Sequence, residues 1–336
     1  MTRHFSKALL ALIALVAIVL FASAPAALAQ TQPPPAANEG QLLEYLKNCP
    51  PGQTCQGRVS IPDARANVLV SPAGRSFAAR MEGWIKRYGG WFLIVVVALL
   101  AAFYVVRGRV RIEGGLSGKT IERFTGIERF GHWMLAVSFI LLAITGLNIR
   151  FGRSVLLPIT GPETFTWLSQ WGKYLHNYAS FAFMAGLVLV TLMWIGHNLP
   201  GKGDLAWIKA GGGILKKGVH PPARKFNAGQ KLIFWLVVLG GATLSVTGIN
   251  MMFEAGTADK AWLAGNIWIH AVAAIVLTGV ALAHIYIGSI GMQGAFDAMG
   301  TGKVDLNWAK EHHSLWVAEM EKSGGAPAGA KMAAAE

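Results

Sequence analysis

Two histidines in one apolar stretch are the residues of this sequence most suited to chemistry. Residues 263–290, LAGNIWIHAVAAIVLTGVALAHIYIGSI, contain no Lys, Arg, Asp or Glu but include His270 and His284. Their spacing makes about four helical turns, so both rings leave one face about 21 Å apart. An ionisable side chain in a membrane helix is costly and marks a functional site by default. The spacing therefore predicts two metal centres, one near each membrane surface.

Two further histidines lie at matching depths in other spans. The apolar stretches predict five membrane-spanning helices, near 91–106, 130–149, 173–196, 231–252 and 263–290. His132 lies at the start of the second span and His176 at the start of the third. Because successive spans cross in opposite directions, His176 matches the depth of His270, and His132 matches that of His284. Two imidazole pairs, one per leaflet, suit the axial ligation of two b-type haems in a helical bundle.

Other interpretations of the histidines stay open. A single intramembrane histidine is often a packing or hydrogen-bonding residue. His197 is a rival inner ligand, because it shares a face with His176 within roughly 60°. The HNLPG sequence nevertheless marks a helix end there and favours an interfacial residue. We interpret the remaining histidines near the C-terminal half as solvated loop residues: His220, His312 and His313. Four glycines are candidates for letting a flat haem macrocycle approach the backbone: Gly131, Gly146, Gly186 and Gly279.

The composition is that of a membrane protein. Of the 336 residues, 53% are hydrophobic and 14% are charged, which argues against a soluble multidomain protein. The net charge of +13 raises the question of nucleic acid, but the basic residues lie in loops between apolar stretches. We therefore expect membrane lipid and no nucleic acid as a partner. Two cysteines are too few for an iron–sulfur cluster or a multi-cysteine zinc site within this chain.

Basic residues also predict the orientation of the spans. Loops 107–131 and 197–231 hold six and seven Lys or Arg residues, whereas the loops around 150–173 and 260 hold three and one. The positive-inside rule places the first two loops in the cytoplasm. The C-terminus is then cytoplasmic and the N-terminal segment periplasmic, in a bacterial inner membrane.

The remaining segments are assigned by composition. Residues 1–29 read as a signal peptide with a basic start and an Ala-Leu-Ala cleavage site, or as an uncleaved anchor. Residues 30–83 are expected to be periplasmic and loosely ordered, with Cys49 and Cys55 as a disulfide candidate. Covalent haem attachment is unsupported because there is no CxxCH motif. We expect an extra transmembrane helix at 84–108, a diheme four-helix bundle at 119–300 and a cytoplasmic tail at 301–336.

Two amides at the predicted inner membrane edge are candidates for binding a quinone. Asn227 and Gln230 lie in FNAGQKLIFW, just before an apolar helix and on the side of His132 and His284. Their amides can hydrogen-bond a quinone carbonyl, with His284 as a third candidate for that site. Equally, Asn227 can serve only as the N-cap of the helix, with Gln230 in solvent.

Several motifs in fixed order resemble the cytochrome b gamma subunits of respiratory formate dehydrogenases. The resemblance covers roughly residues 119–322 and rests on ERFGHW, KYLHNYASF, HNLPGKGD, FNAGQKLIFW, IWIHAVAA, AHIYIGSIGMQGAFDAMGTGKV and WAKEHH. It implies an all-α diheme b556-type bundle. In such subunits the outer haem uses the residues matching His176 and His270, and the inner haem those matching His132 and His284. The quinone pocket of the family uses the amides that match Asn227 and Gln230.

The resemblance also implies partners and an electron path. It implies a membrane anchor that passes electrons from an iron–sulfur (beta) subunit through two haem b groups to ubiquinone or menaquinone near the cytoplasmic face. Formate would be oxidised on a separate molybdenum or tungsten (alpha) subunit, since no motif here suits a pterin cofactor. One alternative is the cytochrome b of a nickel–iron hydrogenase or thiosulfate reductase, and another is a haem-free transporter or assembly protein. The signal sequence, the CPPGQTC segment and the extra span depart from the short four-helix form of the family.

Overall fold

The computed structural model describes residues 79–214, 218–253 and 259–322, together with residues 44, 47, 48, 76 and 77. The predicted signal peptide (1–29) lies outside the described residues. So do the disulfide candidate, Cys49 and Cys55, and the end of the predicted tail.

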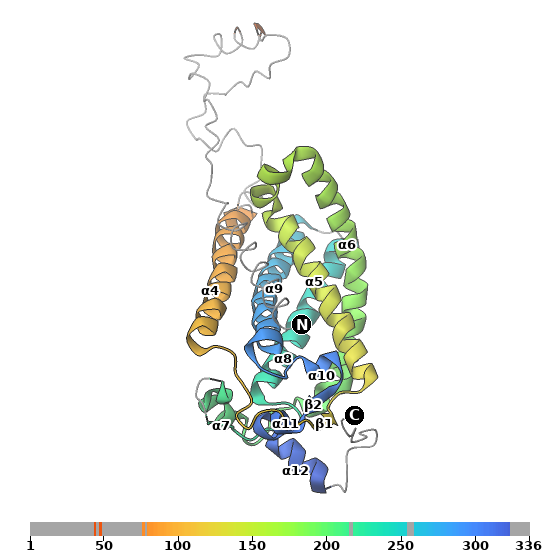
Figure 1. The fold of residues 1–336 in the computed structure, drawn as a ribbon. Helices are drawn as coiled ribbons and strands as arrows, with labels where there is room; N and C mark the ends of the chain where they lie inside the picture. The colour runs from red at the N-terminus through yellow and green to blue at the C-terminus, as the bar shows by residue number, and fades with distance from the viewer. Residues whose placement is uncertain are drawn as a thin grey trace.

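Five helices in the described part of the chain are long and apolar enough to cross a membrane, and they stand side by side (Figure 1). Their composition explains them, because each consists of apolar residues with few charges over the length of a bilayer. The all-α membrane fold with one helix before a four-helix bundle is therefore confirmed. In chain order the elements are η1 (Arg80–Gly89) continuing into α4 (Gly90–Arg107), α5 (Gly126–Val155), α6 (Leu157–Trp194) continuing into η2 (Ile195–His197), α8 (Ala228–Phe253), and α9 (Lys260–Tyr286) continuing into η4 (Ile287–Gly291).

The helices pack as two hairpins with an additional helix at one side. Helix α5 lies along α6, α8 lies along α9, and α4 packs against α9 (Figure 1). The contact between α4 and α9 is close at Gly279 of α9. A Cβ atom there would lie only 2.7 Å from Cε1 of Phe92 on α4, so the absence of a side chain permits this approach. The extra span thus begins at Arg80, four residues before the predicted boundary, and is joined to the bundle along α9.

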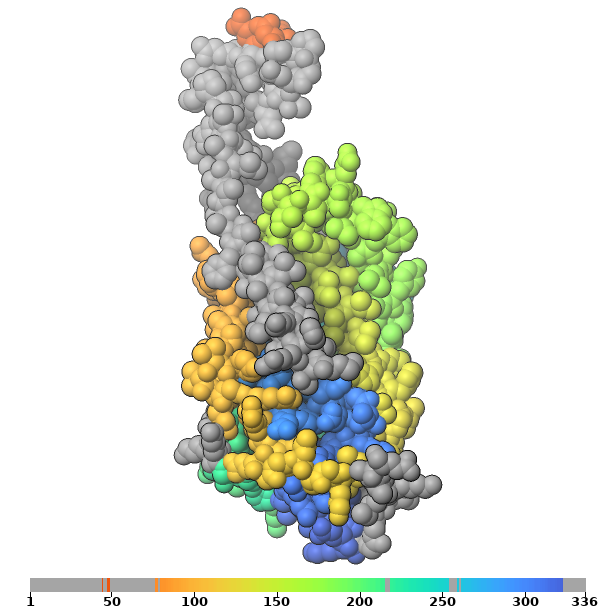
Figure 2. Space-filling model, viewed as in Figure 1, coloured from red at the N-terminus to blue at the C-terminus, as the bar shows by residue number. Residues whose placement is uncertain are grey.

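Helices α5 and α6 extend beyond the apolar stretches that predicted them. The segment expected to be an outer loop is helical on both sides of Leu156, with a break at Gly161, whose φ is 76°. The resulting turn projects past the end of α4 (Figures 1 and 2). Trp171 lies 6.4 Å from Trp167 and 5.9 Å from Tyr174, between ring centres. Exposed aromatic side chains of this kind are typical of a membrane–water interface.

A cap of short elements closes the opposite end of the bundle, which the basic loops predict to be cytoplasmic and which is called the inner end below (Figure 1). Strand β1 (Thr120–Glu122) pairs antiparallel with β2 (Lys303–Asp305), which joins the first inner loop to the region after the last span. The other elements of the cap are α7 (Asp204–Lys209), η3 (Gly211–Gly213), α10 (Asp297–Gly300), α11 (Leu306–His312) and α12 (Ser314–Lys322).

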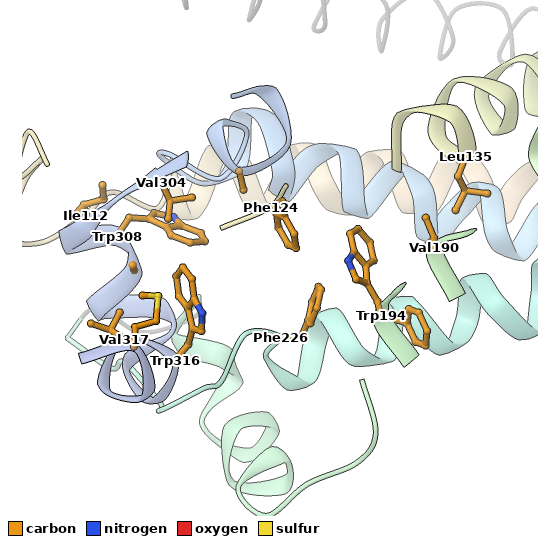
Figure 3. Packing of buried hydrophobic residues seen from close by; sticks show 14 of the residues in the cluster. Ile112, Phe124, Leu135, Val190, Trp194, Phe226, Val304, Trp308, Trp316 and Val317 are labelled. Carbon is orange, nitrogen blue, oxygen red and sulfur yellow. The ribbon is translucent and has the colours of Figure 1, made fainter. Parts of the chain in front are cut away.

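The cap shares its core with the bundle. Figure 3 shows Trp308 and Trp316 of the cap in line with Phe124, Phe226 and Trp194 at the inner helix ends. All five aromatic side chains are buried. Residues 303–322 are therefore part of the folded membrane domain rather than a separate tail, because their apolar side chains complete its core.

The interpretation of His312 and His313 as solvated loop residues is wrong. His313 is 1% exposed: its Nδ1 lies 2.7 Å from the carbonyl oxygen of Arg224, and its Nε2 lies 3.0 Å from a guanidinium nitrogen of Arg123. Burial and the positive charge of Arg123 hold the pKa of His313 well below its usual range. His312 is half-buried beside Trp308. His220 is exposed, as expected, with its Nε2 3.0 Å from the carboxylate of Glu113. The segment that carries His312 and His313 folds back onto the bundle, which removes these two rings from open solvent.

Candidate functional site

The structure brings the four predicted histidines together in two pairs, at opposite ends of the bundle. His132 of α5 and His284 of α9 lie 6.2 Å apart between ring centres. His176 of α6 and His270 of α9 lie 6.3 Å apart, with the same 62° angle between ring planes. Helix α9 therefore supplies one ring to each pair, and the two other rings come from the two helices of the α5–α6 hairpin.

The spacing of each pair fits a haem iron between the rings. A metal–imidazole bond is about 2 Å long, and the centre of an imidazole lies about 1.2 Å beyond its bonding nitrogen. Two such ligands on opposite sides of one iron therefore have ring centres about 6 Å apart, close to both observed separations. Two imidazoles also match the two axial positions that a haem leaves for the protein. The donor set and its spacing thus suit b-type haem.

Threonine hydroxyls contact Nδ1 of both rings of the outer pair, which is His176 and His270. Oγ1 of Thr145 on α5 lies 2.8 Å from Nδ1 of His176. In the same way, Oγ1 of Thr247 on α8 lies 2.9 Å from Nδ1 of His270. Sequence reasoning missed both threonines. The signal that could have found them is a repeated pattern, ITGLN at 144–148 and VTGIN at 246–250.

Only one of the four candidate glycines lies against a paired histidine. A Cβ atom on Gly146 would lie 3.3 Å from Cε1 of His176. Gly131 instead faces Met193 and Leu189, and Gly186 meets the backbone of Leu135, while Gly279 receives α4. The glycine that matches Gly146 at the other outer ring is Gly248, which was not among the candidates: a Cβ atom there would lie 3.5 Å from Cε1 of His270.

The inner pair has different surroundings. The ring of His284 is exposed on the described chain, and Nδ1 of His132 is buried without a hydrogen-bond partner among the described residues.

Buried charges position the helix start that carries His132. Glu128, one turn earlier on α5, forms a capping box with Thr125. Its carboxylate also accepts hydrogen bonds from Nε1 of Trp194 at 2.9 Å and from Nζ of Lys225 at 2.8 Å. These contacts tie α5, α6 and the segment before α8 together at the inner end, and so fix the depth of His132.

The two candidate amides cap helix α8 reciprocally. The backbone N–H of Gln230 donates to Oδ1 of Asn227 at 2.9 Å, and the backbone N–H of Asn227 donates to Oε1 of Gln230 at 3.0 Å. Asn227 is therefore the N-cap of α8, as one interpretation of the sequence expected, whereas Gln230, which that interpretation placed in solvent, is half-buried and completes the cap. Each cap uses an amide oxygen, so the NH₂ groups are the donors that a ligand carbonyl can accept from.

His197 stands apart from the histidine pairs. It ends the short η2 turn after α6, its side chain is exposed, and its ring centre lies 6.5 Å from that of Phe226. This position agrees with an interfacial residue at the end of a helix.

Comparison with known proteins places all four paired histidines within one matched region. Residues 123–302 match the prokaryotic cytochrome b561 family, whose name implies haem b. The chain is 31% identical over 215 residues to the nitrate-inducible formate dehydrogenase cytochrome b556(Fdn) subunit of Escherichia coli K12, covering 61% of this chain and 94% of that protein. It is 29% identical over 212 residues to the formate dehydrogenase cytochrome b556(Fdo) subunit of the same organism, covering 61% and 95%.

A third relative is the formate dehydrogenase cytochrome b556 subunit of Haemophilus influenzae, 30% identical over 201 residues, covering 57% of this chain and 79% of that protein. The resemblance expected from the sequence motifs is confirmed by these three relatives. The family match spans more than half of the chain, from the start of α5 to the cap, and includes both histidine pairs. This chain is a helical membrane protein of the prokaryotic cytochrome b561 family.

Proposed function

We propose that the chain is the membrane-anchor cytochrome b subunit of a formate dehydrogenase in a bacterial inner membrane. Support comes from the named relatives, which are all cytochrome b556 subunits of formate dehydrogenases. The proposed partners are an iron–sulfur (beta) subunit, which delivers electrons, and a molybdenum or tungsten (alpha) subunit, which oxidises formate. The proposed acceptor is ubiquinone or menaquinone near the cytoplasmic face.

The observation that carries the proposal is the presence of two histidine pairs, one at each end of a single bundle. Haem b bound in each couple supplies a one-electron carrier. His176 and His270 would hold the outer group, and His132 and His284 the inner one. Because His270 and His284 share helix α9, their depths differ by about 21 Å along its axis, which provides two stations across the membrane.

The rest of the bundle surrounds the two proposed haem sites with apolar side chains. Helices α5, α6, α8 and α9 present apolar side chains along their length and contain no charged residue between the two histidine depths of α9. A low-dielectric surrounding strengthens the interaction of each ligand with a bound metal. The α9 helix fixes two ligands at once, so the spacing of the stations does not depend on a loop.

Aromatic contacts connect the inner pair to the proposed quinone site. The ring of His132 lies 6.4 Å from that of Trp194, which lies 5.4 Å from the ring of Phe226. Phe226 directly precedes Asn227. The NH₂ groups of Asn227 and Gln230 are suitable donors to a quinone carbonyl, and His284 lies at the same end of the bundle. The nearby ion pair of Lys225 and Glu128 provides groups that can stabilise a proton entering from the cytoplasmic side.

Haem content tests the ligand assignment. The wild-type chain is expected to bind two b haems, measured as pyridine haemochrome per chain. His270→Ala and His284→Ala are each expected to leave one, because each removes one axial ligand from a different couple. His197→Ala is the matched control and is expected to keep two, since His197 is exposed and lies outside both pairs. Two haems retained in either pair variant would overturn the assignment.

The electron donor is tested separately. The tagged chain is purified with its native partners, the large subunit is identified by mass spectrometry, and quinone reduction is measured with formate and with hydrogen. We expect a pterin-containing subunit and reduction by formate. A nickel–iron large subunit with reduction by hydrogen would keep the haem sites but replace the proposed donor.

A further inference from the structure

A short internal repeat places the same two residues behind each outer histidine. The repeat reads ITGLN on α5 and VTGIN on α8. Each copy lies on the first helix of a hairpin and meets a histidine on the second: Thr145 meets His176 of α6, and Thr247 meets His270 of α9. The two hairpins thus build the outer site from equivalent parts, although the sequence separations differ.

The hydrogen bonds fix which nitrogen of each ring carries the proton. A threonine hydroxyl has one hydrogen to donate. Oγ1 of Thr145 donates it to the carbonyl oxygen of Leu141 at 2.7 Å, and Oγ1 of Thr247 donates to that of Thr243 at 2.7 Å. Towards each imidazole the hydroxyl oxygen is therefore the acceptor, and Nδ1–H is the donor. This leaves Nε2 of both His176 and His270 with a free lone pair, as an iron ligand requires.

The glycine after each threonine keeps the ring close to the helix. Gly146 and Gly248 have no side chain where Cε1 of His176 and of His270 approaches, at 3.3 and 3.5 Å from an added Cβ. Each outer ring is therefore held by a hydroxyl and by a flat patch of backbone next to it. The neighbouring helix, α5 for His176 and α8 for His270, therefore contributes to the orientation of each ring.

The inner pair lacks an equivalent hold on His132. Its Nδ1 is buried without a partner among the described residues, in contrast to Nδ1 of both outer rings. A hydrogen bond from Nδ1–H to an acceptor raises the electron-donating strength of the ligand nitrogen. A stronger donor favours the oxidised form of a bound iron and so lowers its reduction potential.

We propose that Thr145 and Thr247 are positioning residues of the outer site, which fix the ligand tautomer of His176 and His270 and hold the outer haem at a lower reduction potential than the inner one. This inference rests on the proposed ligation by the two histidine pairs. It gives the chain a built-in direction, because an electron on the carrier of lower potential moves spontaneously to the other. The direction runs from the outer pair to the inner pair.

Valine replaces threonine with the same shape and no hydroxyl, so Thr145→Val and Thr247→Val test the proposal. The potentials are measured by redox titration of the purified protein. The same substitutions in a His284→Ala background, which keeps only the outer couple, identify which haem responds. We expect the outer potential to rise in each single variant and to rise further in the double variant. The low-spin electron paramagnetic resonance signal of the outer centre should shift as well.

Two controls separate this role from a general effect on packing. Thr243→Val lies one turn before Thr247 and removes a hydroxyl that donates only to the carbonyl oxygen of Leu239, at 2.9 Å. It should leave both potentials unchanged. Thr145→Ser and Thr247→Ser keep the acceptor and should behave as wild type. If valine prevents accumulation of the protein, alanine at the same positions provides the comparison.

The outcomes distinguish this inference from the proposed function. Unchanged outer potential and spectrum in the double valine variant, with two haems bound, would overturn the role of the threonines and leave the ligand assignment intact. A rise confined to the inner potential would also overturn it. A wild-type chain without haem would instead overturn the proposed function itself.

Discussion

At the scale of single residues, Asn227 and Gln230 combine a structural role with a proposed binding role. Their amide oxygens cap helix α8, so replacing either by alanine would cost about 1 kcal/mol of helix stability whatever else the residue does. An alanine variant therefore cannot separate capping from ligand binding. A substitution that keeps the oxygen and removes the NH₂ group can.

Asn227→Asp and Gln230→Glu meet that requirement. Each keeps an acceptor for the backbone N–H, and a negative charge is favourable at a helix N-terminus. We expect the thermal midpoint to stay within a few degrees of wild type, while the KM for quinone in the purified complex rises several-fold. Thermal unfolding and quinone reduction are measured on the same preparation. An unchanged KM in both variants would remove these amides from the quinone site.

The outer glycines offer a matched pair for a second test. Gly146→Ala places a methyl group 3.3 Å from Cε1 of His176, tighter than ordinary contact, whereas Gly248→Ala places one at 3.5 Å from His270. Alanine gains about 1 kcal/mol of helix propensity over glycine, and overpacking costs about 1–3 kcal/mol. We expect Gly146→Ala to lower outer haem content and Gly248→Ala to retain it. Equal haem loss in both variants would contradict this difference in space.

At the scale of elements, two buried histidines predict that the stability of the inner cap depends on pH. Burial lowers the pKa of His312 to about 4, and burial with the charge of Arg123 lowers the pKa of His313 well below its usual range. Both rings are neutral in the folded cap. Once the cap opens, their pKa returns to the ordinary value of about 6.5. The open cap therefore binds more protons, and acid favours opening.

We expect the cap to be most stable above about pH 6.5 and to lose protection progressively between pH 6.5 and 4. Amide hydrogen exchange of residues 303–322, corrected for the intrinsic effect of pH, measures this loss. His313→Ala should be less protected at pH 8, because it leaves Arg123 without its imidazole partner, and should show a shallower pH dependence. A wild-type cap equally protected at pH 7 and pH 4.5 would contradict the expected linkage.

Sequence and structure agree on elements where one physical cue is sufficient. Apolar stretches located all five spans, because a bilayer demands long uncharged helices. The cues failed where folding depends on distant partners. Strands β1 and β2 have three residues each, and all four helices of the bundle lie between them in the sequence. No local periodicity therefore predicts them. The outer extension of α6 was missed because hydropathy detects only the part of a helix that lies in the membrane. Beyond that part, the helix continues through polar residues.

The same reasoning explains the outcome at the candidate site. Depth along successive spans was enough to group the histidines that the structure brings together. Thr145 and Thr247 were missed because a hydroxyl contact between helices leaves no mark on hydropathy. Only the recurrence of Thr-Gly-x-Asn in two spans carries that information. The burial of His313 depends on Trp308 and Trp316 folding back, which a short polar sequence did not reveal.

At the scale of the whole molecule, five spans give the two ends of the described chain opposite sides of the membrane. The basic loops predict a cytoplasmic cap and a periplasmic start of α4. A fluorescent protein fused after Glu336 should therefore be bright, and alkaline phosphatase fused at the same point should be inactive. Phosphatase fused in the 157–172 region should be active. The reverse pattern would invert the proposed orientation and, with it, the direction of electron flow.

The pairing of β1 with β2 has a consequence for how the protein is made. Strand β1 emerges from the ribosome before α5, but its partner follows every span of the bundle. The strand pair at the inner end consequently cannot form until residue 305 has been translated, whereas the α5–α6 hairpin can assemble much earlier. A chain stopped just before residue 303 would have the five described spans and all four paired imidazoles, but it would lack β2, α11 and α12 of the cap.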